Sequence, residues 1–204
     1  MDHKFARFRS QTTTVIAVLL VLFHLYTAAF GLLEAMSQRN IHLTAALLMV
    51  LLTRPAKNRY GVLVDSLLVA ATIAAGIYTA IQAPTMALRA GTVYRTDIIF
   101  GLMTMVLILE GTRRLMGPAM PLVALAMVSY MFFGHHLPQP YGHPPYSLER
   151  ITSIQYMTGE GIYGTPLGAS ASFIVLFIAF GAFLEASGGG RFFMDLSSLY
   201  TKSS

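Results

Sequence analysis

The chain has no cysteine and no tryptophan, and only 11% of its 204 residues are charged. Without cysteine, disulfides, thiol catalysis and cysteine-ligated metal sites are excluded. Without tryptophan, an aromatic belt at a membrane surface would have to come from the ten tyrosines. Soluble domains carry about 25% charged residues. The scarcity of charge therefore argues against a soluble fold.

What the chain has instead is apolar sequence in long runs. Hydrophobic residues make up 55% of it, and the mean hydropathy is +0.61. These values place it among membrane proteins, with the lipid bilayer as its surroundings. The net charge of +5 does not indicate nucleic-acid binding, because the basic residues form short clusters between apolar runs. Such clusters are typical of loops that fix helices in a bilayer.

The apolar runs predict an all-α, polytopic membrane helix bundle of about six transmembrane helices. The predicted spans are Thr12–Leu33, Ile41–Thr53, Val62–Gln82 (ended by Ala83 and Pro84), Thr96 to about Thr112 (capped by Thr96 and Asp97), Met116–Gly134 and Pro166–Ala186. The first run is too long for the core of a signal peptide, so we interpret it as a retained helix. The second reaches only about 20 Å. It is either a short helix packed among others or a span that recruits its flanks.

The basic residues fall unequally on the two sides of this layout. Ten lie on the side of the N-terminus: Lys4, Arg7, Arg9, Arg54, Lys57, Arg59, Arg113, Arg114, Arg191 and Lys202. Four lie on the other: Arg39, Arg89, Arg95 and Arg150. Cytoplasmic loops carry the excess of Lys and Arg, so the N-terminus is predicted to be cytoplasmic and region 135–165 to lie outside. The same bias supports the short second run as a true crossing.

The outer region combines an irregular loop with a short helix. Prolines and a glycine in residues 135–147 suit an ordered loop. Ser147 is placed to cap a helix with Leu148, Ile151 and Ile154 on one face, which we expect to lie at the outer interface. The chain is then broken and turned into the last span by Gly159, Gly161, Gly164 and Pro166.

Acidic residues inside a membrane are functional candidates, and three occur near span ends. Asp65 lies near the start of the third span and Glu185 ends the last. Glu110 precedes Arg113 and Arg114 by three and four residues, a spacing that pairs them on one helical face. A proton or ion relay would need carboxylates near the membrane midplane, and none of these three lies there. We therefore expect pairing at helix ends, or snorkelling, for all three.

Four histidines are candidates for a functional site. His24 lies near the middle of the first span, where it could serve a proton relay or bond a neighbouring helix. We expect a hydrogen bond to a neighbouring helix, because no acidic residue lies at a similar depth to take part in a relay. His135, His136 and His143 cluster in the outer loop and could bind a metal. Their spacing matches no standard metal site, so a docking or packing surface is the preferred interpretation.

The last span opens with small residues. Gly164, Gly168 and Ser172 recur every four residues, which suits close helix packing. The alternative is that a face bearing Ser170 and Ser172 borders a solute pathway. Gly188–Gly190 is expected to break the helix at the cytoplasmic side, as discontinuous transporter helices do, or simply to form a turn. Without a phosphate loop, nucleophile triad or metal-ligand set, we expect no enzyme activity and no cofactor.

A longer pattern carries a family resemblance. Residues 147–193 read SLERITSIQYMTGEGIYGTPLGASASFIVLFIAFGAFLEASGGGRFF. Upstream come IHLTAALLMVLL, RAGTVYRTDIIFG and LILEGTRRLMGPAMPLVALAMVSYMFFG. From about residue 40 onward the chain resembles the fused permease of tripartite ATP-independent periplasmic (TRAP) transporters. It is most similar to the group served by TAXI-type solute-binding proteins.

The resemblance implies three parts. Residues 1–115 would be a four-helix domain like the small subunit, 116–146 a connector helix and outer loop, and 147–204 the beginning of the large transport domain. It also implies a multi-pass protein of the bacterial inner membrane. Such a protein couples the inward movement of an organic acid to a sodium gradient and receives the solute from an extracytoplasmic TAXI-type binding protein.

The chain departs from the family pattern by stopping at Ser204. The hairpins that hold solute and sodium would follow that point, so no substrate-binding residue is transferred. The remaining large permease domain is then an expected partner, and the chain alone is not expected to transport. A fragment, a truncated product and one piece of a split permease are all compatible with this. The alternative function is a non-transport membrane assembly or scaffolding protein.

Overall fold

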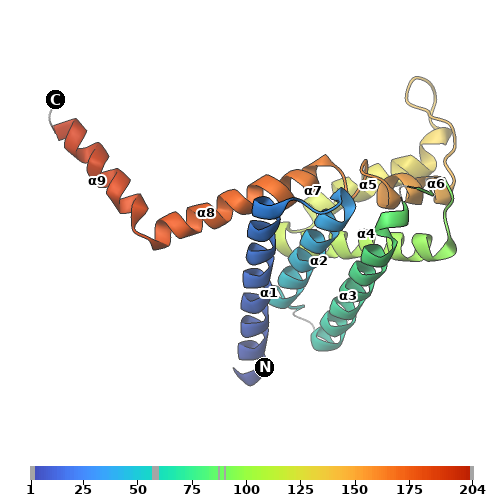
Figure 1. Cartoon of the computed structure of the whole chain (residues 1–204). Coiled ribbons are helices and arrows are strands. Elements are labelled where there is room, and N and C mark those ends of the chain that lie inside the picture. The colour runs from blue at the N-terminus through green and yellow to red at the C-terminus, as the bar shows by residue number, and fades with distance from the viewer. Residues whose placement is uncertain (1–2, 57–59, 87, 90, 203–204) are drawn as a thin grey trace.

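The computed structural model describes residues 3–56, 60–86, 88–89 and 91–202, and the regular structure in this part of the chain is helical. Lys57 and Arg59, two of the predicted cytoplasmic basic residues, lie outside it, as do the side chains of Lys4 and Lys202. Figure 1 shows the arrangement of the elements. The α-helices are α1 His3–Phe30, α2 Ala35–Thr53, α3 Gly61–Met86, α4 Arg95–Met116, α5 Ala119–Phe133, α6 Leu148–Thr152, α7 Thr165–Ala169, α8 Val175–Ala186 and α9 Gly189–Lys202.

Three further short turns complete the path. A 3₁₀ turn, Gly134–His136, follows α5. A π-helical turn, Ser153–Met157, extends α6, and a second, Ser170–Ile174, joins α7 to α8. The predicted last span is therefore one nearly continuous helix with a π-helical turn inside it. Such turns occur frequently at functional sites.

The prediction of an all-α membrane bundle is confirmed. Within the described residues, four helical segments are long and apolar enough to cross a membrane: Arg7–Phe30, Gly61–Met86, Ala119–His136 and Thr165–Ala186. The other two predicted spans form helices α2 and α4 but are not among these four, since α2 has a polar first half and α4 carries charges near both ends.

Several helix boundaries differ from the predicted ones. Helix α2 begins at Ala35, so it recruits its polar flank, and its 19 residues extend about 28 Å. Helix α3 continues through Pro84 to Met86. The predicted cap at Thr96 and Asp97 is displaced: Tyr94 is the N-cap residue, and Asp97 takes part in the cap as the third residue of a capping box. Asp97 lies inside the first turn, where its carboxylate accepts the Tyr94 backbone N–H at 2.8 Å.

Helices α1 to α4 run in alternating directions. Arg9, near the start of α1, donates to the carbonyls of Leu51 and Leu52 at the end of α2. Tyr78, near the end of α3, donates to the Thr96 hydroxyl at the start of α4. Helix α2 lies in the middle and contacts α1, α3 and α4. Figure 1 shows α1, α2 and α3 side by side.

Two features hold the centre of this bundle together. Leu47 of α2, Ala75 of α3 and Leu107 of α4 form a buried apolar cluster. At Gly76 of α3, a Cβ would lie 2.6 Å from the Thr44 hydroxyl of α2. Only glycine fits there, so the two helices cross in direct contact.

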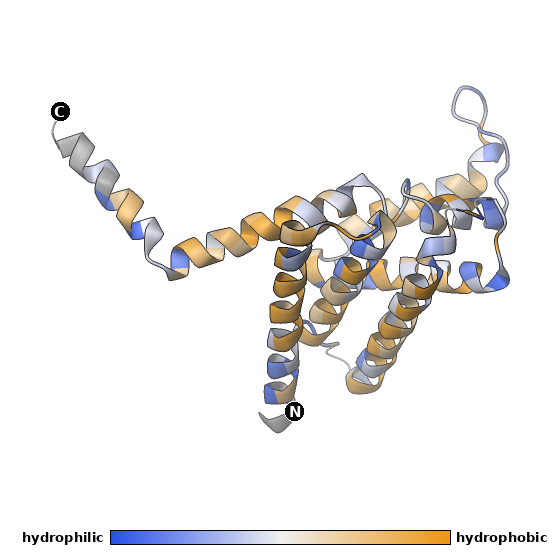
Figure 2. Cartoon of the chain, viewed as in Figure 1, coloured by the Kyte–Doolittle hydropathy of each residue, from blue (hydrophilic) through white to orange (hydrophobic). Residues whose placement is uncertain are grey.

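Helix α8 leaves the bundle and presents a largely apolar surface. In Figure 2 it is coloured as hydrophobic along most of its length. Phe177, Ile178 and Phe183 are each about two-thirds exposed or more. After Ala186 the chain turns at Gly188, whose φ of +79° suits glycine, and α9 begins at Gly189. The predicted helix break at Gly188–Gly190 is confirmed.

Candidate functional site: a buried polar joint

Residues 148–174 fold back onto the first four helices and bury several of their side chains there. Helix α6 and the π-helical turn after it pack on α4, while α7 and the next π-helical turn pack on α2. Ser147 accepts the Arg150 backbone N–H at 3.2 Å, so its predicted capping role is confirmed. The contact surface of this segment is a set of buried side chains: Ile151, Thr152, Tyr156, Met157, Tyr163 and Ala171. We call the surface between residues 148–174 and α1–α4 the polar joint.

A chain of hydrogen bonds crosses the polar joint from α1 to the last span. His24 Nε2 lies 3.0 Å from His42 Nδ1, and His42 Nε2 lies 3.1 Å from the Ser170 hydroxyl. The Gln38 amide nitrogen lies 3.1 Å from His24 Nδ1. One set of tautomers satisfies all three contacts: Gln38 donates to His24, His24 to His42, and His42 to Ser170. The expectation that His24 bonds a neighbouring helix is confirmed.

Gln38 is the branching point of this chain. Its amide nitrogen also lies within hydrogen-bond distance of the Thr27 hydroxyl, at 3.2 Å, and of the Ala171 carbonyl, at 3.3 Å. The Gln38 side chain is buried, and its Oε1 has no hydrogen-bond partner among the described residues. Gln38 therefore ties α2 both to α1 and to the π-helical turn of the last span.

A second cluster joins the loop before α7 to α2 and α3. The Tyr156 and Thr79 hydroxyls lie 2.7 Å apart. The Tyr163 hydroxyl reaches Asn40 Oδ1 at 3.3 Å and Thr79 at 3.4 Å. Asn40 donates in turn to the Gly76 carbonyl at 2.9 Å. All four side chains are buried, so their mutual hydrogen bonds are needed to offset the loss of water.

Arg39 forms the edge of the polar joint. Its guanidinium donates to the Tyr163 carbonyl and lies over Gly168, where a Cβ would be 2.8 Å away. Nearby, the Glu34 carboxylate caps α2 by accepting the backbone N–H groups of Met36 and Ser37, both at 2.9 Å. Partial burial alone would raise the pKa of Glu34, but these hydrogen bonds outweigh it and hold the pKa below its usual value.

Two ionic clusters fix opposite ends of the bundle. At one end, Arg89 forms a two-point ion pair with the fully buried Asp97, at 2.6 and 2.9 Å. At the other, the Asp65 carboxylate accepts from Arg9 at 3.3 Å and from Arg114 at 2.7 Å. The second cluster therefore links α1, α3 and α4.

The predicted end-pairing of acidic residues holds for two of the three. Asp65 is paired as above, and Glu110 binds both Arg113 and Arg114 at 2.7 Å. Glu185 is exposed at the end of α8 and has no ion pair with the described residues. Glu110 and Arg114 extend the Asp65 cluster along α4.

The outer histidines serve packing in this structure. His143 donates from both ring nitrogens, to the Tyr130 carbonyl at 3.0 Å and the Pro144 carbonyl at 2.7 Å, and stacks on Tyr146. These two acceptors raise the pKa of His143. His135 and His136 stack on each other. The described residues contain no group of three or more potential ligands placed to hold a metal ion.

The small residues of the last span are also used in contacts. Ser170 bonds His42, Gly168 packs under Arg39, and the Ser172 hydroxyl donates to the Gly168 carbonyl at 2.6 Å. A Cβ on Gly164 would lie 2.8 Å from the Gly161 carbonyl oxygen. Gly168 and Ser170 therefore make close packing contacts, as one interpretation predicted. A solute pathway along this face stays a prediction.

The residues that make the joint were mostly missed from sequence. His42 lies inside the predicted span Ile41–Thr53 and Gln38 and Asn40 just before it, but none of them was predicted as a site residue, and neither were Tyr156 and Tyr163. The usable signal was the alternation of three polar residues ahead of an apolar run in one helix. Polar groups at that depth must face protein, so they pointed to a buried partner surface.

The fold and the polar joint together define a multi-pass helical membrane protein whose first helices contact the start of the last span. Residues 103–201 match the family described as Tripartite ATP-independent periplasmic transporter, DctM component. This match spans just under half of the chain and supports similarity of that region to the membrane component of a TRAP transporter. No curated protein and no solved structure matches the chain significantly.

Proposed function

We propose that the chain forms part of the permease of a TRAP-type secondary transporter that imports organic acids. The observation that carries this is the position of the polar joint. The family match begins within α4 and ends within α9, and the polar joint packs that region onto α1–α3, which lie ahead of it. The whole chain then acts as one permease part, in which the four-helix region 1–115 supports the region from 147 onward, with 116–146 as the connector.

The proposed orientation places the N-terminus in the cytoplasm of a bacterial inner membrane. Arg9, Arg54 and Arg114 meet at one end of the bundle, where Arg114 donates to the Arg54 carbonyl at 3.0 Å. Arg39 and Arg89 lie at the helix ends on the opposite side. This grouping is the one expected if the first end faces the cytoplasm.

The proposed partners are the remaining large permease domain and a TAXI-type solute-binding protein that delivers the organic acid from outside. The exposed apolar side chains of α8 support further helices as neighbours there. We further propose that transport is coupled to a sodium gradient and that the chain alone does not transport. Similarity to a transporter family gives no reason to propose a catalytic role.

The test is uptake by membrane vesicles that contain the chain, the rest of a TAXI-associated permease and the matching binding protein. A panel of radiolabelled mono- and dicarboxylic acids serves as probe, with an imposed sodium gradient. We expect accumulation of at least one acid only when all three proteins are present. Equal accumulation without this chain would refute a role in transport and favour a scaffolding protein.

A further inference from the structure

Three adjoining hollows lie at the end of the bundle where Arg9 meets Asp65. A basic cleft of about 520 Å³ is lined by Arg54, Arg113 and Arg114 together with Thr53 and Pro55. A hydroxyl-rich cleft of about 370 Å³ shares Thr53 and Pro55 with it. An apolar groove of about 310 Å³ shares Arg9 and Leu52 with the second cleft. The hollows therefore form a series that changes from charged to polar to apolar.

The basic cleft has cationic groups free to receive an anion. Within the described part of the chain, the exposed Arg54 guanidinium has no carboxylate partner. Arg113 uses Nε and Nη2 for Glu110, and its side chain is 56% exposed. Arg114 uses Nε for Glu110 and Nη1 for Asp65 and the Arg54 carbonyl, and its side chain is only 5% exposed. Arg54 and Arg113 are thus the groups that can bind an incoming phosphate.

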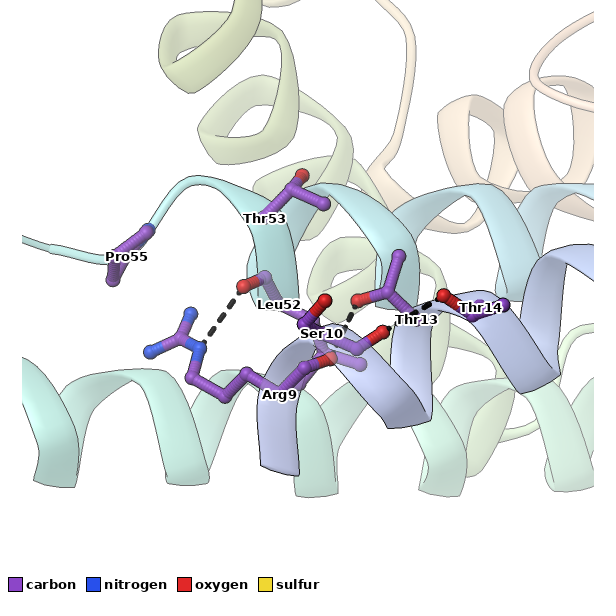
Figure 3. Close-up of a pocket in the computed structure, with 7 residues that line it drawn as sticks. All are labelled: Arg9, Ser10, Thr13, Thr14, Leu52, Thr53 and Pro55. Carbon is purple, nitrogen blue, oxygen red and sulfur yellow. Dashed lines mark hydrogen bonds between the residues drawn. The ribbon is translucent and has the colours of Figure 1, made fainter. Parts of the chain in front are cut away.

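The hydroxyl-rich cleft suits a polar, uncharged group. Figure 3 shows Ser10, Thr13 and Thr14 on α1 beside Thr53 of the neighbouring helix α2, and all four residues line the cleft. The Thr13 and Thr14 hydroxyls donate to backbone carbonyls four residues back, at 2.9 and 3.1 Å, which leaves their oxygens able to accept. Arg9 does not contribute charge to a ligand here, because it is held by Asp65 and two carbonyls.

The apolar groove suits hydrocarbon. It runs between α1 and α3, and its walls include Phe8, Leu51, Val69, Ala70 and Ile73. A phosphate, uncharged glycerol ester groups and an acyl chain follow one another in this order in a glycerophospholipid, which matches the order of the three hollows. A free phosphate ion would use the first hollow and would have no need of the third.

The geometry points to a binding site for an anionic glycerophospholipid, with its phosphate at Arg54 and Arg113, its glycerol ester groups beside Ser10 and Thr13, and an acyl chain along α3. Basic pockets between helices on the cytoplasmic side are suited to such headgroups. This site lies away from the polar joint. It is independent of which solute the transporter carries.

The test is lipid binding by the purified full chain in detergent, measured by native mass spectrometry. Dioleoyl phosphatidylglycerol is compared with dioleoyl phosphatidylcholine. We expect the glycerol lipid to bind more tightly, Arg54→Gln and Arg113→Gln each to weaken it about fivefold, and the double variant about thirtyfold. Arg150→Gln, at the opposite end, is the matched control and should leave the affinity unchanged.

A second arm separates lipid from free phosphate. Ala70→Trp fills the groove and should weaken phosphatidylglycerol, while glycerol 1-phosphate binds the variant and the parent chain alike. Thermal stability by fluorescence-detected size exclusion shows that each variant is folded. Equal binding of the two lipids, or no effect of the arginine changes, would overturn the site. Displacement by millimolar inorganic phosphate with no effect of Ala70→Trp would make it a phosphate site instead.

Discussion

Asp65→Asn tests whether the ionic cluster at the proposed cytoplasmic end stabilises the bundle. The Asp65 carboxylate accepts from Arg9 at 3.3 Å, Arg114 at 2.7 Å and the Ala56 backbone N–H at 3.2 Å. The side chains of the three charged residues are 5–9% exposed. Removing one partner of a buried pair costs about 3–5 kcal/mol, because the remaining charge loses its compensation.

The structure places this substitution at the low end of that range. Arg9 keeps the Leu51 and Leu52 carbonyls, and Arg114 keeps Glu110. We therefore expect the free energy of unfolding to fall by about 3 kcal/mol. The assay is equilibrium unfolding by increasing SDS mole fraction in mixed micelles, followed by circular dichroism.

Arg113→Gln is the matched control, since it removes a more exposed pair worth about 0–1 kcal/mol. A loss below about 1 kcal/mol for Asp65→Asn, equal to the control, would refute the cluster as a stabilising element. A loss of about 3 kcal/mol in both variants would show that burial of the ion pair does not decide the effect.

Three further predictions concern the polar joint and the outer loop. His42→Leu should lower the free energy of unfolding by about 1–3 kcal/mol, because it leaves the buried His24 ring and the Ser170 hydroxyl without their partner. The same SDS titration measures this loss. As a control, His135→Leu at an exposed position should leave the free energy of unfolding nearly unchanged. Gly168→Val should displace the Arg39 guanidinium and speed trypsin cleavage after Arg39, whereas unchanged cleavage would contradict the close contact. The raised pKa of His143 means that its contacts stabilise the loop most below the unfolded pKa and weaken as pH rises through the folded one. A spin label at Gln139→Cys should therefore become more mobile between pH 5.5 and 8.5, and His143→Phe should abolish that pH dependence.

The helices were predictable because long apolar runs leave few alternatives in a membrane protein. Charge asymmetry also predicted which helix ends lie together, and the Arg9, Asp65 and Arg114 cluster confirms that those ends meet. Spacing along the sequence was also sufficient to predict the ion pairs of Glu110 with Arg113 and Arg114 and the helix cap at Ser147.

The polar joint could not be predicted in the same way, because its contacts are long-range. His42 and Ser170 are separated by 128 positions, and Tyr163 and Asn40 by 123. Spacing within one helix carries no information about such partners. The ion pair of Asp97 with Arg89 was not predicted for a related reason, because it depends on how the preceding loop returns to the start of α4.

The most direct test of the joint is a disulfide between Gly101→Cys of α4 and Thr152→Cys of α6, made in a chain that has no other cysteine. A Cβ at position 101 would lie 3.1 Å from the Thr152 Cγ2, which suits the Cβ-to-sulfur distance across a disulfide. Mild oxidation in native membranes should cross-link this pair rapidly. Gly101→Cys with Ser187→Cys, at the far end of α8, should stay reduced (Figure 1). Failure of the first pair to cross-link, or equal cross-linking of both, would contradict the packing of residues 148–174 on the first helices.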